Sequence, residues 1–210
     1  MTAVAPSDTA WAPPPDDRVL DAAAECYLRI GVTKTTAADI ARSAGISRAT
    51  LYRRHGSQEA IFLAVLTRES EAMAADADGH LRGVDDPSER MLEGMMFAIG
   101  EIRSRPVHAA VFGGGSAAWA AGRAIREEAV RRVGLAGVRP LVAPAVLAGA
   151  VLSEEALGDL VDWILRILIS YAAIPGAGDR HPDEIRRQLR SWFLPALPVR
   201  VGAKGEWEQG

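Results

Sequence analysis

The stretch from Gly31 to Ile61 reads GVTKTTAADIARSAGISRATLYRRHGSQEAI, and it decides the fold of this chain. Thr36 is a favourable N-cap residue, and Asp39 lies three positions later as in a capping box, so a short helix should begin there. Gly45 can adopt the left-handed backbone that closes a helix, and Ser47 can cap the next helix. The stretch therefore predicts two short helices joined by a tight turn, which is a helix-turn-helix unit.

The second helix of this unit, at about residues 47–53, has a buried side and an outward side. Leu51 has to point inward, together with Ile46 and Ile40, because these apolar side chains must be covered. The outward side carries arginines, and a guanidinium can donate two hydrogen bonds to O6 and N7 of guanine in a DNA major groove. We therefore expect this helix to contact DNA. Its outward residues are Arg48, Ala49, Tyr52 and Arg53.

The same region is basic, although the chain as a whole is acidic. Between Arg29 and His55 there are six arginine or lysine residues and one acidic residue, whereas the formal net charge of the chain is −3. DNA binding needs only this local excess, because counterions are released where basic side chains meet phosphates. The chain also uses arginine far more than lysine and is rich in alanine, which is typical of a GC-rich genome. Arginine content alone is therefore a weak indication.

An ordered pattern of residues extends from the first expected helix to the start of the fourth. It consists of Ala23, Gly31, Thr36, Asp39, Ile40, Ala41, Ala44, Gly45, Ile46, Ser47, Thr50, Leu51, Tyr52, Ser57, Glu59 and Phe62. This pattern resembles the DNA-binding domain of the tetracycline-repressor-like (TetR/AcrR) family of bacterial transcription regulators. The family often has an aromatic pair where this chain has Arg54 and His55, and a lysine where it has Gln58. The resemblance implies an N-terminal three-helix DNA-binding domain and a C-terminal helical domain for ligand binding and dimerisation.

The resemblance also implies roles for single residues in DNA binding. Arg48 is placed to read a base edge, Ala49 to touch a thymine methyl group, and Arg53 to reach a base or a phosphate. Thr36, Thr50 and Tyr52 match positions that hydrogen-bond phosphates in the family. Such contacts fix the register of the protein on DNA but do not read its sequence. Two alternatives stay open, because Thr36 caps a helix with or without DNA, and Tyr52 can simply pack on the first helix. The expected DNA-binding set is Thr36, Arg48, Ala49, Thr50, Tyr52, Arg53, Arg54 and Gln58.

Enzymatic and metal-binding classes find little support in the composition. The single cysteine, Cys26, excludes an internal disulfide framework and a cysteine-based metal cluster, and we expect it to be a buried free thiol. The four histidines lie far apart without metal-ligand spacing. The glycines at 113–115 lack the lysine and the serine or threonine of a phosphate-binding loop. We therefore expect no metal, no cofactor and no catalytic residues, with an all-α enzyme as the rival class.

Helical periodicity dominates the chain, and strand alternation is absent, so the sequence predicts an all-α fold. We expect a disordered arm at 1–15, a DNA-binding domain at 16–62, a ligand-binding and dimerisation domain at 63–197, and a flexible tail at 198–210. The start of the chain lacks the features of a signal peptide, and no segment is apolar enough to span a membrane, so a soluble cytoplasmic protein is expected. The expected helices are 16–30, 36–45, 47–53, 57–81, 86–104, a short one after 106, 123–151 with kinks at Pro140 and Pro144, 154–173 and 182–194.

The expected helix at 154–173 is apolar on more than one side, and such a helix must be covered on more than one face. The chain's own helices can provide part of this cover, but a symmetric partner is the economical explanation. Together with the last helix, it resembles the family's four-helix dimer interface. A two-fold homodimer implies a pseudo-palindromic operator. The expected dimer residues are Leu157, Val161, Ile164, Leu168, Leu189, Trp192 and Phe193.

In the family, the helical domain encloses a pocket whose small-molecule ligand shifts the fourth helix. Here the middle of the chain offers soft and aromatic side chains that suit a mostly hydrophobic effector, although such residues also form ordinary cores. His108 is a candidate to orient the effector. We expect a dimeric, ligand-responsive regulator, and a repressor because blocking a promoter needs no further contacts. The alternative is a DNA-binding protein without an effector pocket. The expected ligand residues are Met91, Met95, Phe112, Trp119 and Trp163.

Overall fold

The computed structural model describes residues 16–113, 120, 122, 128–147, 153–173 and 180–197. Within these residues every regular element is a helix and none is a strand, which confirms the expected all-α class. The expected arm at 1–15, the expected tail at 198–210 and Trp119 lie outside the described residues. The helices are α1 Asp17–Ile30, α2 Ala37–Ser43, α3 Arg48–His55, α4 Gln58–His80, α5 Pro87–Ser104, α6 Pro106–Phe112, α8 Glu128–Leu147, α9 Glu154–Ala173 and α10 Pro182–Gln188.

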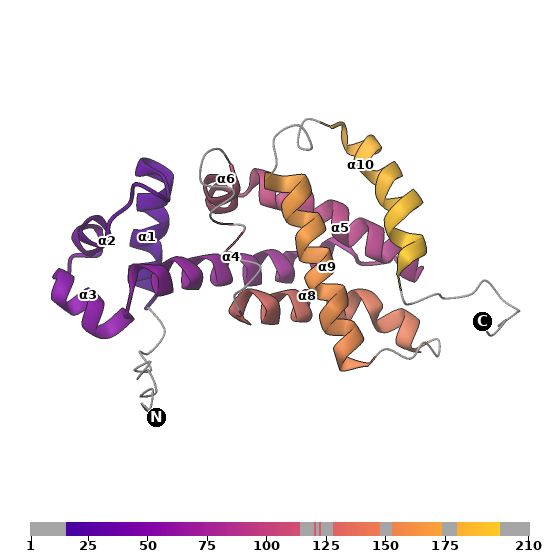
Figure 1. Cartoon of the computed structure of the whole chain (residues 1–210), viewed down its shortest axis with the longest axis horizontal. Helices are drawn as coiled ribbons and strands as arrows, with labels where there is room; N and C mark the ends of the chain where they lie inside the picture. Colours follow the sequence, from indigo (N-terminus) through magenta and orange to yellow (C-terminus); the bar gives the residue numbers. More distant parts are fainter. Residues whose placement is uncertain are drawn as a thin grey trace, which may run out of the picture.

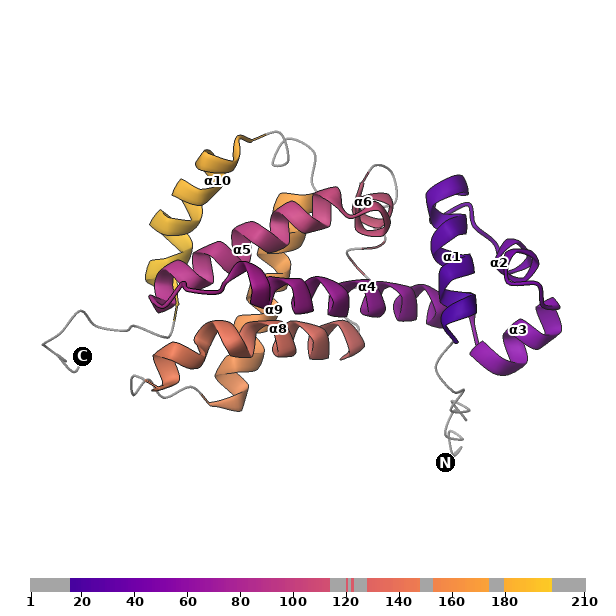
Figure 2. The same cartoon turned by 180° about the vertical axis from the view of Figure 1, so that it is seen from behind.

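The long helix α4 joins two groups of helices. The helices α1, α2 and α3 form a small unit at one end of the molecule, called the head below (Figure 1). The helices α5, α6, α8, α9 and α10 form the body. Seen from the front and from behind, α4 leaves the head and runs into the body beside α5 and α8 (Figures 1 and 2). Its buried residues Ile61, Phe62, Val65 and Leu66 lie in the half nearer the head.

The expected helix starts are present, because each has a side chain that satisfies a free backbone N–H. Asp16, Ser47, Ser57 and Asp86 each accept a hydrogen bond from the backbone N–H three residues later. At the start of α2 the capping box is complete, since Thr36 and Asp39 each accept a bond from the other's backbone N–H. These bonds depend only on near neighbours in sequence, which is why they can be predicted from it.

The helix α2 ends in a Schellman motif, with Gly45 at its left-handed position. The N–H of Gly45 donates to the carbonyl of Arg42 at 3.2 Å, and the N–H of Ile46 donates to the carbonyl of Ala41 at 2.9 Å. Gly45 has φ +66°, and an added Cβ would lie 2.7 Å from a guanidinium nitrogen of Arg18. The positive φ of this turn therefore favours glycine, whereas the Arg18 side chain could move away from an added Cβ.

The helix α8 continues through Pro140 and Pro144 to Leu147. Pro144 has no N–H, so the carbonyl of Pro140 loses its partner within the helix. The guanidinium of Arg90, from α5, supplies the missing donor, with Nε 3.3 Å from the Pro140 oxygen. Arg90 also donates through Nη1 to the carbonyl of Leu81 at 2.8 Å. One side chain thus compensates for a proline in α8 and caps the C-terminal end of α4.

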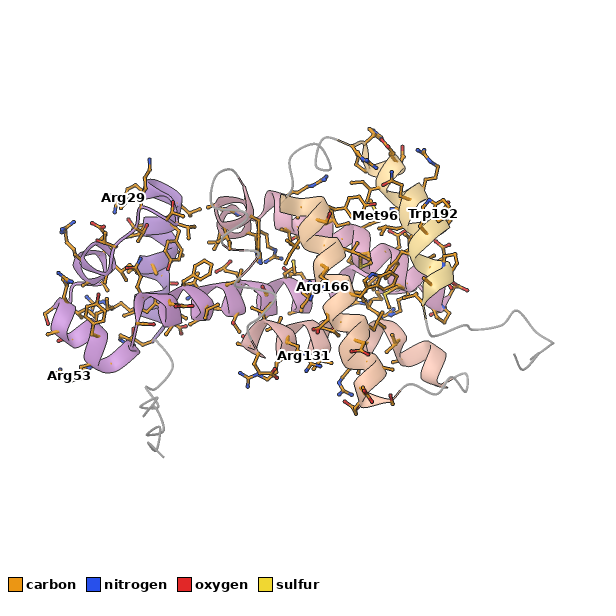
Figure 3. All side chains as sticks on the ribbon, viewed as in Figure 1. Arg29, Arg53, Met96, Arg131, Arg166 and Trp192 are labelled. Atoms are coloured by element: carbon orange, nitrogen blue, oxygen red, sulfur yellow. The ribbon has the colours of Figure 1, made fainter. Side chains whose placement is uncertain are left out.

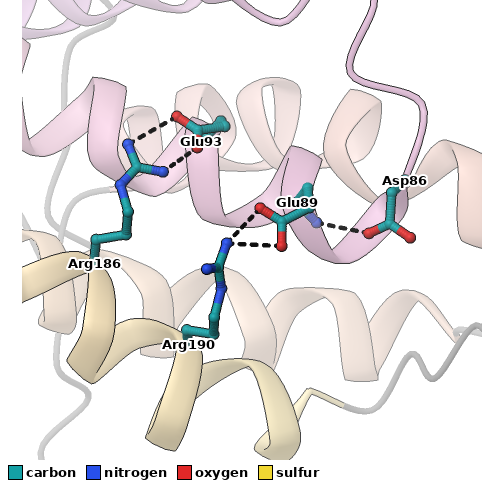
Figure 4. Close-up of polar contacts among 5 residues, drawn as sticks. All are labelled: Asp86, Glu89, Glu93, Arg186 and Arg190. Atoms are coloured by element: carbon teal, nitrogen blue, oxygen red, sulfur yellow. Dashed lines mark hydrogen bonds and ion pairs between the residues drawn. The ribbon is translucent and has the colours of Figure 1, made fainter. Parts of the chain in front are cut away.

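The last helix is held on α5 by two ion pairs. Arg190 donates to both carboxylate oxygens of Glu89, at 2.8 and 2.7 Å, and Arg186 forms a bidentate pair with Glu93 (Figure 4). The hydrogen bond from Arg186 lowers the pKa of Glu93 below its ordinary value. All four side chains are partly exposed, so each pair contributes about 1 kcal/mol at most.

The end of this element differs from the expected helix at 182–194. The helix α10 ends at Gln188, a π-helical turn follows over Leu189–Phe193, and a 3₁₀ turn covers Leu194–Ala196. Pro195 cannot donate the next hydrogen bond of a regular ladder, so the chain changes its helical type just before it. Within this segment Leu189 and Phe193 are buried, whereas Trp192 is 80% exposed.

Candidate nucleic-acid interface and internal cavity

The head places α3 with one side buried and the other free. Ile40 and Leu51 are fully buried between the helices, and Ile46 is half-buried in the turn, as predicted. The hydroxyl of Ser47 accepts a hydrogen bond from the N–H of Thr50 at 3.0 Å and fixes the start of the helix. Arg53 lies at the outer end of the head in Figure 3. The local sequence thus orients α3 with its arginine side toward solvent.

The outward side of α3 consists of residues predicted to contact DNA. Arg48, Ala49, Tyr52, Arg53 and Arg54 are all exposed. Tyr52 is 44% exposed, and the guanidinium carbon of Arg48 lies 5.9 Å from the centre of its ring, which is a cation–π contact. Within the described part of the chain, none of the three guanidiniums is paired with a carboxylate. These charges are therefore free to meet phosphates or bases.

Three other predicted DNA-binding residues already have partners inside the head. The hydroxyl of Thr36 donates to the carboxylate of Asp39 at 2.5 Å, and the hydroxyl of Thr50 lies 2.9 Å from that of Ser47. The amide of Gln58 donates to the carbonyl of Thr35 at 2.6 Å and so ties the start of α4 to the loop before α2. This structural role of Gln58 was not predicted from the sequence.

His55 fills a buried position at the end of α3 that sequence analysis did not identify. Its side chain is 4% exposed, and Nε2 lies 3.8 Å from a carboxylate oxygen of Asp16, the N-cap residue of α1. The imidazole ring is buried within the head, at a position where the TetR/AcrR family often has an aromatic residue. Cys26 is fully buried in the same core, and burial raises the pKa of its thiol. It is a free cysteine, as expected.

The body contains a partly open cavity of about 140 Å³ between α4, α5, α6, α8 and α9. Of the predicted ligand residues, Met95 and Phe112 line this cavity. Met91 is buried in the core but does not line it, and Trp163 is 38% exposed, with its ring centre 5.0 Å from that of Phe193. Met91 and Trp163 thus do not line this cavity, and their role in ligand binding stays a prediction. Helical periodicity identifies apolar residues but not which of them border a void.

Two polar side chains reach the wall of this cavity. Nε2 of His108, on α6, lies 3.3 Å from the hydroxyl of Ser70, on α4. Burial is the main cause that lowers the pKa of His108 to about 4, and the positive charge of Arg105 adds to it. The imidazole is therefore neutral at pH 7. Both helices that carry this pair also pack against α1 of the head.

Other site types are not formed by the described residues. No group of three or more histidine, cysteine, aspartate or glutamate side chains within them is arranged to hold a metal ion. No helix in the described ranges is long and apolar enough to cross a membrane. The features of the described residues that carry chemistry are thus the arginine face of α3 and the cavity.

Residues 19–65 match the sequence profile of "Bacterial regulatory proteins, tetR family". These residues contain most of α1, all of α2 and α3, and the start of α4. The head therefore belongs to the TetR family of DNA-binding domains. The match includes the capped starts of α2 and α3 and the Gly45 turn described above, so the head is the DNA-binding helix-turn-helix of a TetR-family transcriptional regulator.

Similar proteins are regulators of the same type. Over 195 residues this chain is 29% identical to an uncharacterized HTH-type transcriptional regulator of Mycobacterium tuberculosis strain H37Rv, covering 90% of this chain and 88% of the relative. A regulator of Mycobacterium bovis is 45% identical over 56 residues, which is 27% of this chain and 30% of that protein.

Two solved structures of regulators also align with most of this chain. The TetR-family regulator PfmR of Thermus thermophilus is 20% identical, with 92% of this chain and 100% of that chain covered and a TM-score of 0.45. The ketosteroid transcriptional regulator KstR2 of Mycobacterium tuberculosis is 16% identical, with 89% and 97% covered and a TM-score of 0.46.

The residues predicted to form the dimer interface of this TetR-family protein are mostly internal. Val161, Ile164 and Leu168 line the cavity, and Leu157, Leu189 and Phe193 are buried within the single chain. The chain's own α5 and α8 cover this side of α9. The role of these residues in a dimer stays a prediction. Trp192 alone of the predicted set is exposed. A dimer through α9 and α10 has to use their opposite side.

Proposed function

We propose that this TetR-family protein is a dimeric repressor that binds a pseudo-palindromic operator through α3 and is released by a small, mostly apolar molecule. The observation that carries the DNA-binding part is the set of exposed guanidiniums on α3, which have no carboxylate partner among the described residues and lie in the capped helix-turn-helix. Arg48 reads a base edge, and Tyr52 with Thr50 and Thr36 bonds to phosphates. Arg53 and Arg54 supply further phosphate contacts in place of the family's lysine.

Genomic DNA selection tests this function most directly. The full-length protein is mixed with fragmented genomic DNA, and the bound fragments are sequenced. We expect one inverted repeat to be enriched, and its binding constant to fall steeply as salt rises, because each neutralised phosphate releases counterions. Failure to bind any duplex in a salt-dependent way would contradict the proposal. Enrichment of single half-sites would contradict its dimeric part.

The proposed dimer uses the outer side of α9 and α10. Trp192 is 80% exposed, Trp163 is 38% exposed, and both lie on the solvent side of these two helices. Large aromatic side chains in such positions are typical anchors of protein interfaces. In a two-fold symmetric dimer, both protomers contribute this same surface to the interface. The dimer then presents two copies of α3 to DNA. The ion pairs of Arg186 and Arg190 with α5 hold the segment that bears Trp192 in place.

Substitution of Trp192 by glutamate is expected to weaken dimerisation by about 30- to 150-fold, because an interface tryptophan often contributes about 2–3 kcal/mol. Analytical ultracentrifugation over a range of protein concentrations measures this shift. Leu28→Glu is the matched control, since Leu28 is 51% exposed but lies on α1 in the head. An unchanged dimer constant for Trp192→Glu, or an equal change for both variants, would place the interface elsewhere.

The effector part of the proposal is supported by two helices that line the cavity and also pack against the head. The cavity is lined from α4 by Leu66, Ser70 and Met73, and from α6 by His108 and Phe112. Both helices pack on α1, so a molecule that prefers one arrangement of α4 and α6 also favours one placement of the head. The operator affinity then changes by the ratio of ligand affinities for the two arrangements. A protein that responded to no small molecule would fit the alternative of a ligand-independent DNA binder.

A further inference from the structure

The first residue of α4 is bonded to the loop that precedes α2. Gln58 begins α4, and its side-chain amide donates to the backbone carbonyl of Thr35 at 2.6 Å. The two residues lie 23 positions apart, with α2 and α3 between them in the chain. This hydrogen bond therefore joins the two ends of the helix-turn-helix segment to each other.

The carbonyl that Gln58 holds belongs to a buried and well-bonded loop. Thr35 is 2% exposed. Its hydroxyl and its N–H both donate to the carbonyl of Gly31, at 2.8 and 3.1 Å. A buried carbonyl that loses its donor is unfavourable, because little water can reach it. Without the Gln58 amide, the loop would have to shift until this carbonyl found another partner.

The residue after Thr35 is one to which the proposed function assigns a phosphate contact. Thr36 is exposed and forms the N-cap of α2, in a capping box with Asp39. The carbonyl of Thr35 and the nitrogen of Thr36 belong to the same planar peptide unit, so the orientation of one fixes that of the other. A shift of the loop would therefore displace the Thr36 hydroxyl.

We propose that Gln58 is a positioning residue for DNA binding, and that its amide acts by holding Thr36 at the place where a phosphate is bound. The inference rests on the proposed function, which assigns the phosphate contact to Thr36. The alternative is the direct DNA contact that the sequence predicts for Gln58. Positioning is favoured because Gln58 is half-buried and its N–H group is directed at a carbonyl inside the head, in a short hydrogen bond.

A double-mutant cycle with Gln58→Met and Thr36→Val tests the inference. Methionine is similar in length to glutamine but has no N–H to donate, and valine preserves the branched shape of threonine without its hydroxyl group. Each full-length variant is titrated with one duplex that carries the selected operator. We expect Gln58→Met to weaken binding by about tenfold in the wild type and by less than about threefold in Thr36→Val. Additive losses would mean that Gln58 acts independently of Thr36, and would overturn the inference.

The dependence of binding on sequence and salt gives a second readout. We expect Gln58→Met to weaken binding to the operator and to a scrambled duplex by a similar factor, because a phosphate contact carries no sequence information. The dependence of the binding constant on salt should stay the same, since the substitution removes no charge. A loss restricted to the operator would indicate that Gln58 positions the base-reading helix α3, and would overturn its role through Thr36.

A measurement without DNA separates positioning from general destabilisation. Amide hydrogen exchange is followed in the wild type, in Gln58→Met and in Ala60→Met, a matched control that places methionine at an exposed position in the first turn of α4. We expect Gln58→Met alone to accelerate exchange at Thr36 and Asp39, whose N–H groups form the capping box, more than exchange in α5.

Two results of the exchange experiment would overturn the inference. Acceleration by the same factor throughout the chain would indicate a purely structural role for Gln58. Unchanged exchange at Thr36 and Asp39, together with weaker DNA binding, would indicate a direct contact between Gln58 and DNA. Ala60→Met should bind the operator within about twofold of the wild type, because its side chain replaces no hydrogen bond of the loop.

Failure of this inference is distinguishable from failure of the proposed function. If Thr36→Val weakens operator binding but the two losses are additive, only the role of Gln58 is overturned. If Thr36→Val has no effect, the phosphate contact of Thr36 is overturned together with this inference. Absence of salt-dependent operator binding by the wild type overturns the regulator proposal itself.

Discussion

Arg48→Ala is expected to lower the affinity for the selected operator by about 1–3 kcal/mol and to leave binding to unrelated duplexes within about twofold. Arg48 lies at the first position of α3, is exposed, and has no carboxylate partner among the described residues. A bidentate bond to guanine is lost only where the correct base is present, so the loss should depend on sequence. Competition binding with the operator and with a scrambled duplex at one salt concentration measures this difference.

Tyr52→Phe is the informative comparison for Arg48→Ala. It preserves the ring beside the Arg48 guanidinium and removes only the hydroxyl group. We expect it to weaken binding to all sequences by a similar factor, because a phosphate contact carries no sequence information. Arg132→Ala, which removes an exposed arginine from α8 in the body, should change neither affinity. An equal loss on every sequence from Arg48→Ala would contradict its base-reading role.

Lowering the pH from 6.5 to 4 is expected to destabilise the protein, with about 3 kcal/mol of the loss due to His108. Burial lowers the pKa of His108 to about 4 in the folded chain, whereas its ordinary value is 6.5. Between these two values the unfolded chain binds a proton that the folded chain does not. The unfolded state therefore gains as the pH falls through this window, and the contribution is fully present above pH 6.5.

Denaturant unfolding at several pH values between about 7 and 4 measures this effect. His108→Phe should flatten the dependence of the unfolding free energy on pH in that range. His181→Asn is the control, because His181 is exposed and asparagine can replace it as the N-cap of α10. If His108→Phe and wild type lost stability equally on acidification, the assignment to His108 would be wrong.

The head was predictable because its determinants lie close together in sequence. The Thr36–Asp39 capping box and the glycine turn after α2 act over three to six residues, and the structure confirms both. The start and end of α9 were likewise predicted from local signals, as Glu154 and Ala173. Capping residues and apolar periodicity predict where helices begin and end, because both depend on neighbours in the same helix.

The contacts between helices were not predictable in the same way. The helix α9 is apolar on two sides, and nothing in its own sequence indicates which side its own chain covers. Val161 and Ile164 are buried inside the chain, whereas Trp163 between them is exposed. The bond of Gln58 to Thr35 and that of Arg90 to Pro140 join residues 23 and 50 positions apart. Such pairs depend on the tertiary arrangement, and no periodicity encodes them.

The length of α4 determines how far its head end moves when the helix tilts. Its 23 residues form a rod of about 34 Å, since each residue of a helix adds about 1.5 Å. A tilt of about 5° at the cavity end displaces the far end by about 3 Å, a distance comparable to the rise of one DNA base pair. Under the proposed function, a helix of this length would convert a sub-ångström adjustment around a bound effector into a misfit of the head on the duplex.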